Sequence, residues 1–186
     1  MTITDTIIPG AYIFEPKVFH DSRGYFIETF NRKHFIEKGI DVDFVQDNQS
    51  VSHKNVVRGL HAQKGPFEQG KLVRVIKGAV VDIALDVRVG SPAYGKHIGV
   101  ELTAQNNLQL YIPPGCLHGF VSLQDDTIFA YKVTNYFDKD SESGLIWNDP
   151  ELSIGWSINQ MDAIVSEKDQ LLPDWKSYQS PFTFVG

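Results

Sequence analysis

The stretch Pro-Pro-Gly-Cys-Leu-His-Gly-Phe, residues 113–120, is the part of this sequence that decides which fold we expect. Its two prolines and its glycine are a strong turn signal. The residues that follow, from Gly119 to Leu123, have the pattern of a short strand. His118 therefore stands where a turn passes into a strand.

Apolar and polar residues alternate with a period of two in one segment after another, which is the mark of half-buried strands. Turn signals such as Lys77-Gly78 and Gly90-Ser91-Pro92 separate these segments. We predict strands over Ala11–Phe14, Tyr25–Phe30, Phe44–Asp47, Gln49–Ser52, Val56–Arg58, Lys71–Ile76, Ala79–Val87, His97–Leu102, Leu108–Ile112, Gly119–Leu123 and Thr127–Thr134. Many short strands at this spacing indicate an all-β sandwich or barrel. The form Pro-x-Gly-x-x-His favours a double-stranded β-helix, in which a turn delivers the histidine into the barrel mouth.

Helical signals are few. Residues Arg32–Lys38, stopped by Gly39, predict about two turns of helix with Phe35 and Ile36 as the apolar side. Ser166–Asp169 matches a capping box for a second short helix, which Pro173 would end quickly. No linker or repeat of fixed period divides the chain, so we predict one domain over residues 1–186.

Composition excludes several classes of protein. A formal net charge of -6 and the lack of a basic run argue against a nucleic-acid partner. Cys116 is the only cysteine, so neither an intrachain disulfide nor a cysteine-based zinc framework can form. No stretch approaches the roughly 18 apolar residues of a membrane span, and the first residues lack the pattern of a signal peptide. We therefore expect a cytoplasmic protein with no membrane partner.

The segment Val-Arg-Gly-Leu-His-Ala-Gln, residues 57–63, gathers polar groups that cannot all be core. His61 has the side chain best suited to take and return a proton near neutral pH. Arg58 offers a planar fork of donors that suits a phosphate or carboxylate. The alternative is the end of a strand with a hydrogen-bonded core histidine and a surface arginine.

Strand parity places two further polar groups on apolar faces. Lys71 shares a face with Val73 and Val75, and Tyr131 shares one with Phe129. If these faces line the barrel interior, an ammonium and a phenol project into it and require polar partners. Alternatively, Lys71 is a strand end whose ammonium reaches water, and Tyr131 is a plain core aromatic.

A metal site is poorly supported. Metal-dependent double-stranded β-helix proteins carry His-x-His in the earlier motif, where this chain has His61-Ala62-Gln63. A metal ion would then have to be bound by His61, His118 and Glu68. These are at most three ligands, and such a site needs three or four. We predict acid-base chemistry with no metal and no cofactor.

Taken together, these stretches resemble the dTDP-4-dehydrorhamnose 3,5-epimerase family, whose members are metal-independent and have the cupin fold. The resemblance runs from about Pro9 to Pro173 and rests on Asp21–Glu28, Gln46–Asn48, Arg58–Gln63, Gln69–Arg74, Ile112–Gly115, His118–Phe120, Tyr131-Lys132, Asn135-Tyr136 and Ile146–Asp149. Two departures are visible, since Ala62 stands where the family usually has an aromatic residue and Cys116-Leu117 replaces an aromatic-small pair. Both bear on the shape of the pocket and leave the proton-transfer groups in place.

The resemblance implies a cupin-type jelly-roll barrel and a dTDP-4-keto-6-deoxyhexose substrate, whose ketone acidifies the hydrogens on carbons 3 and 5. Inversion requires a base on one face and an acid on the other. By family match His61 is the base, Asp169 orients it, Tyr131 is the acid and Lys71 lies beside the keto oxygen. Asp169 could instead only complete the capping box with Ser166.

The other implied contacts bind the substrate, with Arg23 and Arg58 on the diphosphate and Phe137 on the thymine. The full set is Arg23, Phe26, Glu28, Gln46, Asp47, Asn48, Arg58, Lys71, His118, Tyr136, Phe137, Glu142 and Lys168. Asp82 is a possible partner of His118. We also expect a homodimer in which the segment Arg23–Glu28 reaches the neighbouring subunit's pocket. Three rival functions remain, namely a mono-epimerase of carbon 3 or 5, a metal-dependent cupin oxygenase and a non-catalytic sugar-binding cupin.

Overall fold

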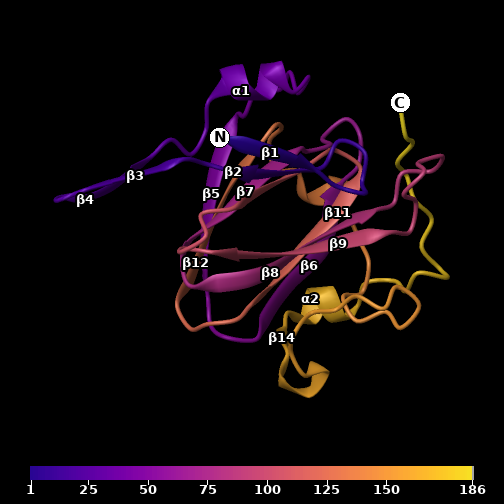
Figure 1. The fold of residues 1–186 in the computed structure, drawn as a ribbon. Coiled ribbons are helices and arrows are strands. Elements are labelled where there is room, and N and C mark those ends of the chain that lie inside the picture. The colour runs from indigo at the N-terminus through magenta and orange to yellow at the C-terminus, as the bar shows by residue number, and fades with distance from the viewer. Residues whose placement is uncertain (186) are drawn as a thin grey trace.

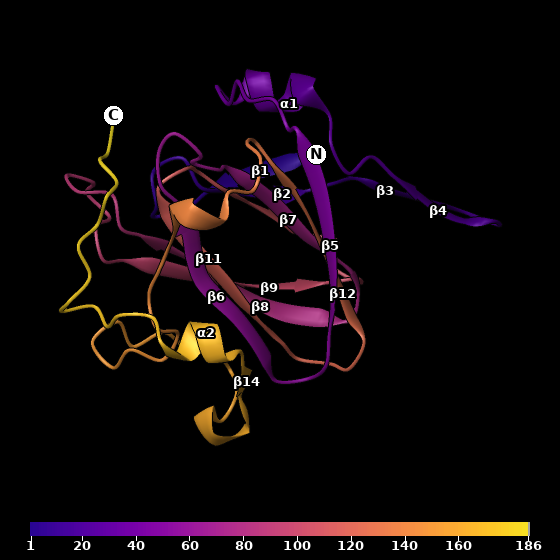
Figure 2. The same ribbon diagram turned by 180° about the vertical axis from the view of Figure 1, so that it is seen from behind.

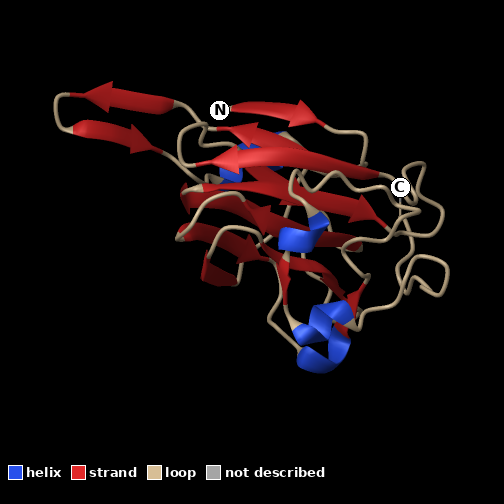
Figure 3. Ribbon diagram, turned by 90° about the horizontal axis from the view of Figure 1, so that it is seen from below, coloured by secondary structure: helices blue, strands red, loops and turns tan. Residues whose placement is uncertain are grey.

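Strands dominate the computed structural model, which describes residues 1–185 (Figure 3). The elements in chain order are β1 (Thr2–Asp5), β2 (Tyr12–Glu15), β3 (Val18–Asp21), β4 (Gly24–Ile27), α1 (Arg32–Glu37), β5 (Gln46–Ser52), β6 (Val56–Gln63), β7 (Lys71–Lys77), β8 (Ala79–Asp86), β9 (His97–Thr103), β10 (Gln109–Ile112), β11 (Cys116–Ser122), β12 (Thr127–Val133), the 3-10 helix η1 (Lys139–Ser141), β13 (Glu142–Gly144), η2 (Gln160–Asp162), β14 (Ile164–Val165) and α2 (Glu167–Gln170). Gly186, the last residue of the predicted domain, lies outside the described residues.

Two sheets face each other and form the body of the molecule. One has the strand order β1-β2-β10-β7-β12-β5, and the other has the order β13-β6-β11-β8-β9 with β14 beside β6. Neighbouring strands within each path are antiparallel, and the short β14 runs parallel to β6. The all-β, cupin-type double-stranded β-helix is confirmed, as two facing sheets that do not close into a complete ring.

The main core lies between the sheets. Buried apolar side chains from β7, β10 and β12 of one sheet meet those from β8, β9 and β11 of the other, among them Val73, Leu110, Val80, Leu102 and Phe129. Every residue of β8 is buried, because its second face is covered as well. That outer face packs against Trp147, Trp156 and Phe182 from the C-terminal segment. Burial on both faces explains why six of the eight residues of this strand are apolar, the exceptions being Asp82 and Asp86.

The helix α1 covers the outer face of the first sheet. Its Phe35 is fully buried and stacks on Phe14 of β2 with ring centroids 4.5 Å apart. Asn31 caps the helix by accepting a hydrogen bond from the backbone of Lys33 at 3.0 Å. The prediction that Ile36 belongs to the apolar side is wrong, since this side chain is 50% exposed. A helix of less than two turns presents too narrow a face to bury two neighbouring residues.

Several strand bounds differ from those predicted. The segments predicted at Phe44–Asp47 and Gln49–Ser52 are joined in one strand, β5, which begins at Gln46 and not at Phe44. The strand predicted at Val56–Arg58 continues to Gln63. β6 extends because β11 and β13 pair with it on its two sides. The strand predicted over Tyr25–Phe30 stops at Ile27. The short strands β1, β3, β13 and β14 were not predicted, because two to four residues carry too little alternation to be recognised.

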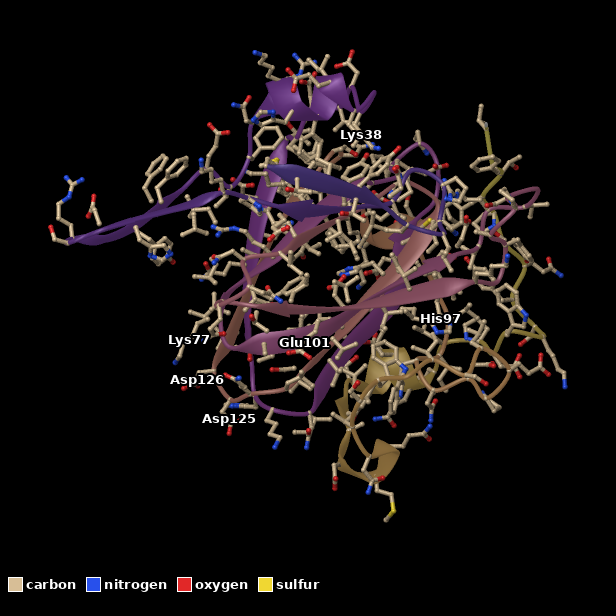
Figure 4. All side chains as sticks on the ribbon, viewed as in Figure 1. Lys38, Lys77, His97, Glu101, Asp125 and Asp126 are labelled. Atoms are coloured by element: carbon tan, nitrogen blue, oxygen red, sulfur yellow. The ribbon has the colours of Figure 1, made fainter. Side chains whose placement is uncertain are left out.

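The hairpin β3–β4 extends away from the body of the molecule, as Figures 1 and 2 show from opposite sides. Elsewhere the surface carries paired charges, such as Lys77 and Asp126, which lie at one end of the molecule in Figure 4 with the ammonium and carboxylate 3.6 Å apart. Pairs this exposed contribute little to stability. Within residues 1–185, no helix has the length and apolar character that crossing a membrane requires.

Candidate active site

A cavity of about 490 Å³ opens between the two sheets, and a second hollow of about 350 Å³ continues from it. His61 of β6, Lys71 of β7 and Tyr131 of β12 line both spaces. Lys71 and Tyr131 therefore reach the interior, as strand parity predicted. The stacked rings of Phe120 and Phe129, with centroids 4.2 Å apart, also line the larger cavity.

Gly59 brings the two histidine-bearing strands close together. It has a φ of 113°, and a Cβ on it would lie 2.5 Å from the carbonyl oxygen of His118 and 2.6 Å from Cα of Gly119. Only glycine permits this approach of β6 to β11. In the resulting register His61 stands opposite His118.

His61 is held by a buried carboxylate. Its Nε2 lies 2.8 Å from Oδ1 of Asp169, which is 4% exposed. Burial favours a higher pKa for Asp169, but the hydrogen bond and charge of His61 and the hydrogen bond from the backbone N–H of Gly59 outweigh it and hold the pKa below its usual range. The carboxylate stays ionised and orients the ring, while no described residue hydrogen-bonds to Nδ1 of His61. That nitrogen is left for a proton from the cavity.

Asp169 reaches His61 from the short helix α2, which lies beside β6 in Figure 2. Ser166 caps this helix, with its Oγ accepting a hydrogen bond from the backbone of Asp169 at 3.2 Å. The carboxylate of Asp169 does not complete the predicted capping box. It accepts instead from His61 and, at 3.4 Å, from the backbone of Gly59.

His118 forms a second histidine-carboxylate pair deeper in the barrel. Its Nε2 lies 2.8 Å from Oδ2 of Asp82 on β8, and both side chains are buried. Burial lowers the pKa of His118 and raises that of Asp82, and the contact between the two opposes both effects. The other carboxylate oxygen of Asp82 has no hydrogen-bond partner among the described residues. This pair fits a role in shaping and polarising the cavity more than in carrying net charge.

Lys71 supplies a cation whose charge is easily lost. Burial lowers its pKa to about 8, although Asp82 and Glu142 favour the charged form. At neutral pH the ammonium is still mostly protonated, and it faces both hollows. A partly desolvated ammonium on a cavity wall suits the stabilisation of a developing oxyanion.

Tyr131 carries a phenol that keeps its proton. Burial raises its pKa above the usual value, while nearby Arg58 opposes the shift. No described residue hydrogen-bonds to its hydroxyl, which leaves the proton available for a bound molecule. After Tyr131 has donated its proton, the nearby guanidinium of Arg58 would stabilise the transient phenolate.

Cationic and amide groups surround the opening. Arg58 is braced by Ser52, with Nε 3.2 Å from Oγ, and Lys168 pairs with Glu142 across the mouth. Gln46 donates to Asn48 at 2.8 Å, and both line the smaller hollow. These are the groups that the resemblance assigned to an anionic nucleotide sugar.

Ser50 was missed by sequence reasoning. Its hydroxyl is buried on the cavity wall without a hydrogen-bond partner among residues 1–185. The signal was parity along β5, since Ser50 shares a face with Gln46 and Asn48. Splitting this strand at polar residues hid that signal.

Some predicted contacts do not reach this cavity. Asp47 lies on the opposite face of β5 and pairs with Lys132 at 2.8 Å. Arg23, Phe26 and Glu28 belong to the extended hairpin or its end, and the Arg23 guanidinium pairs locally with Asp21 at 2.7 Å. None of these three residues lines the cavity or the smaller hollow. The hairpin β3–β4 itself extends away from the body of the molecule (Figure 1).

Tyr136 and Phe137 lie in the loop after β12 and are 63% and 60% exposed. Phe137 lines the smaller hollow. Within residues 1–185, no group of three histidine, cysteine, aspartate or glutamate side chains is placed to hold a metal ion.

Comparison with known proteins gives a consistent result. A family model described as dTDP-4-dehydrorhamnose 3,5-epimerase matches residues 5–177. A protein of that name from Shigella flexneri is 49% identical over 170 residues, which cover 91% of this chain and 93% of the other.

Two crystal structures show the same fold. That of dTDP-4-dehydrorhamnose 3,5-epimerase from Elizabethkingia anophelis has a TM-score of 0.91 at 48% identity and covers 95% of this chain and 97% of its own. That of dTDP-6-deoxy-D-glucose-3,5-epimerase from Legionella pneumophila, in complex with dTDP-4-keto-L-rhamnose, has a TM-score of 0.93 at 39% identity and covers 100% and 99%.

Proposed function

The chain belongs to the dTDP-4-dehydrorhamnose 3,5-epimerase family, and from this premise we propose that it inverts carbons 3 and 5 of dTDP-4-dehydro-6-deoxy-D-glucose to give dTDP-4-dehydro-L-rhamnose. The observation that carries the proposal is the shared cavity of His61, Lys71 and Tyr131. His61 is held by the buried carboxylate of Asp169, and no residue within 1–185 hydrogen-bonds to the hydroxyl of Tyr131.

The chemistry follows from the ketone at carbon 4, which acidifies the hydrogens on carbons 3 and 5. Nδ1 of His61 takes a proton from one of these carbons, and the electron pair moves onto the keto oxygen as an enolate. Lys71 stabilises this charge. Tyr131 then returns a proton to the opposite face of the carbon, and solvent restores His61 and Tyr131 before the second centre reacts.

Substrate binding divides between the groups at the opening. Arg58 and Lys168 suit the diphosphate because guanidinium and ammonium groups pair strongly with phosphate oxygens. Phe137 is proposed to stack on the thymine and His118 to contact the sugar. Further proposed contacts are Tyr136 and three residues of the smaller hollow, Gln46, Asn48 and Glu142.

A homodimer is part of the same proposal. Arg23, Phe26 and Glu28 serve as ligand contacts only if the hairpin β3–β4 reaches another subunit's pocket. Its exposed aromatic side chains, Phe19, Tyr25 and Phe26, support such a contact, since they are 50%, 61% and 68% exposed in the single chain. A cytoplasmic location and the extent of one domain over residues 1–186 remain predictions.

We also propose that no metal or cofactor takes part. The amide of Gln63, which stands where metal-dependent cupins have a histidine, is committed to three backbone hydrogen bonds. Prolonged incubation with a chelator should leave turnover unchanged. Loss of activity that one divalent ion restores would favour a metal-dependent cupin instead.

Incubation with dTDP-4-keto-6-deoxyglucose in deuterated water tests the function directly. NMR should show deuterium incorporation and inverted configuration at both carbons 3 and 5. Label and inversion at one carbon alone would make the chain a mono-epimerase. Binding without any exchange would make it a sugar-binding protein that has lost catalysis.

A further inference from the structure

We propose that Gln63 is a positioning residue that holds Phe137 at the mouth of the smaller hollow and thereby sets the affinity for the nucleotide. The inference rests on the proposed function, in which Phe137 stacks on thymine. It concerns a buried amide whose partners are all backbone groups of the chain.

The side-chain amide of Gln63 hydrogen-bonds to the backbone of the residues before and after Phe137. Its Nε2 donates to the carbonyl oxygen of Tyr136 at 3.0 Å, and its Oε1 accepts from the backbone N–H of Asp138 at 2.8 Å. The same Nε2 donates to the carbonyl oxygen of Phe67 at 2.7 Å. Gln63 is only 5% exposed, so water cannot easily replace these bonds.

Phe137 depends on its backbone for its position. Its ring is 60% exposed, and none of the buried apolar clusters includes it. The loop from Thr134 to Asp138 lies between β12 and η1 and has no strand partner of its own. Nothing in the packing of the ring would therefore restore its place if the loop moved.

Two other amides join the same pair of loops. Gln69 donates to the carbonyl oxygen of Asn135 at 2.7 Å, and Asn135 donates to that of Pro66 at 3.0 Å. These links hold the loop at its start, before Tyr136. Gln63 is the link next to Phe137 itself.

Only a primary amide satisfies this arrangement. The site needs two donors for two carbonyl groups and one acceptor for an N–H, and glutamine supplies both kinds from one planar group. Glutamate has the same shape but no donor, so its carboxylate would face two carbonyl oxygens. Methionine keeps much of the volume and makes none of the three bonds.

The test measures binding of dTDP and of inorganic pyrophosphate by titration calorimetry. We expect Gln63→Met to raise the Kd for dTDP about tenfold, the cost of about one or two hydrogen bonds, and to leave the Kd for pyrophosphate within about twofold. With saturating substrate, deuterium should exchange within about twofold of the wild-type rate, while KM rises. Gln63→Glu, which keeps the acceptor for Asp138, should act in the same direction.

A double-mutant cycle shows whether the effect passes through Phe137. Phe137→Ala should weaken dTDP binding by itself, and adding Gln63→Met to it should cause no further loss. Asn106→Leu is the matched control, because the Asn106 amide also joins three backbone groups, in the turn between β9 and β10, and should bind dTDP as the wild type does.

Different results separate this inference from the proposed function. If Phe137→Ala weakens dTDP binding but both Gln63 variants bind like the wild type, the positioning role is wrong and the function stands. If the variants melt earlier but change neither Kd nor KM, Gln63 serves stability alone. If Phe137→Ala has no effect on dTDP, the thymine contact fails and the inference fails with it.

Discussion

His61 and Tyr131 line the same cavity, but their surroundings affect them differently. One nitrogen of His61 is occupied by Asp169, so a single basic position remains. No residue within 1–185 hydrogen-bonds to the hydroxyl of Tyr131, and burial raises its pKa, so in the proposed mechanism Tyr131 acts as the proton donor. The two groups should therefore fail in different ways when they are removed.

Tyr131→Phe keeps the ring and removes only the hydroxyl. We expect this variant still to exchange substrate protons for deuterium, because His61 can return a proton to the face it came from. Inversion, especially at carbon 5, should fall sharply.

His61→Ala should instead lose deuterium exchange at both carbons, by about a hundred- to ten-thousand-fold. NMR in deuterated water scores label and configuration separately, with circular dichroism to confirm folding. Normal inversion by Tyr131→Phe would assign the donation to another group.

The pH dependence of the reaction should report Lys71. Its pKa of about 8 means that the stabilising charge disappears as the pH rises through that value, so kcat/KM should fall on the alkaline side. Tyr131 cannot cause this fall, because burial raises its pKa above the usual value of about 10 for a phenol. Lys71→Arg should remove the fall near pH 8, since a guanidinium stays charged. Lys71→Met should lose about a hundred- to a thousandfold in kcat. An unchanged alkaline limb in Lys71→Arg would assign the titration to another group.

At the scale of elements, the pairing of β6 with β11 decides whether the site forms. β6 brings His61 and Arg58, and β11 brings His118. The two strands approach at Gly59, where any Cβ meets the backbone of His118 and Gly119. The short helix α2 then packs beside β6 and supplies Asp169.

Gly59→Ala should therefore damage stability and activity together. The positive φ and the backbone clash are expected to cost about 3 kcal/mol or more of the free energy of unfolding. Urea unfolding measures the loss, and the deuterium assay measures activity. Gly155→Ala is the control, because no atom lies within 4 Å of its ideal Cβ position and its φ is not positive. Equal stability of the two variants would show that β6 and β11 can move apart at no cost.

The whole molecule, taken as a single chain, has an incomplete set of predicted ligand contacts. The hairpin β3–β4, which holds Phe26 and the turn residue Arg23, extends away from the body of the molecule (Figure 1). Its aromatic side chains are exposed in the single chain. A symmetric dimer that exchanges hairpins would complete both sites at once.

Complementation between two impaired variants tests this exchange. His61→Ala and Arg23→Ala should each be impaired alone, but their co-expressed mixture should regain activity, because one site of a mixed dimer has both changes and the other has neither. A mixture of His61→Ala with Tyr131→Phe is the control. It should recover nothing, since both residues come from the same subunit's cavity. A fully active monomer in sedimentation at micromolar concentration would contradict the dimer.

Local patterns in the sequence determined the all-β architecture, most strand positions and the inward direction of Lys71 and Tyr131. The reason is that strand periodicity and turn residues act over a few neighbours. The motif around His61 and the Pro-x-Gly-x-x-His stretch likewise carry the family assignment without reference to coordinates.

Tertiary structure decided the contacts between residues far apart in the chain, although the family resemblance had already implied that Asp169 orients His61 and that Asp82 could pair with His118. Asp169 meets His61 across 108 positions, the amide of Gln63 reaches the backbone 73 and 75 positions away, and Asp47 turns from the cavity to Lys132. Such contacts depend on which strands become neighbours and on how loops close over them. Strand pairing and loop closure depend on packing over the whole chain. The arrangement that buries the apolar faces of both sheets is favoured, and no short stretch of sequence specifies it.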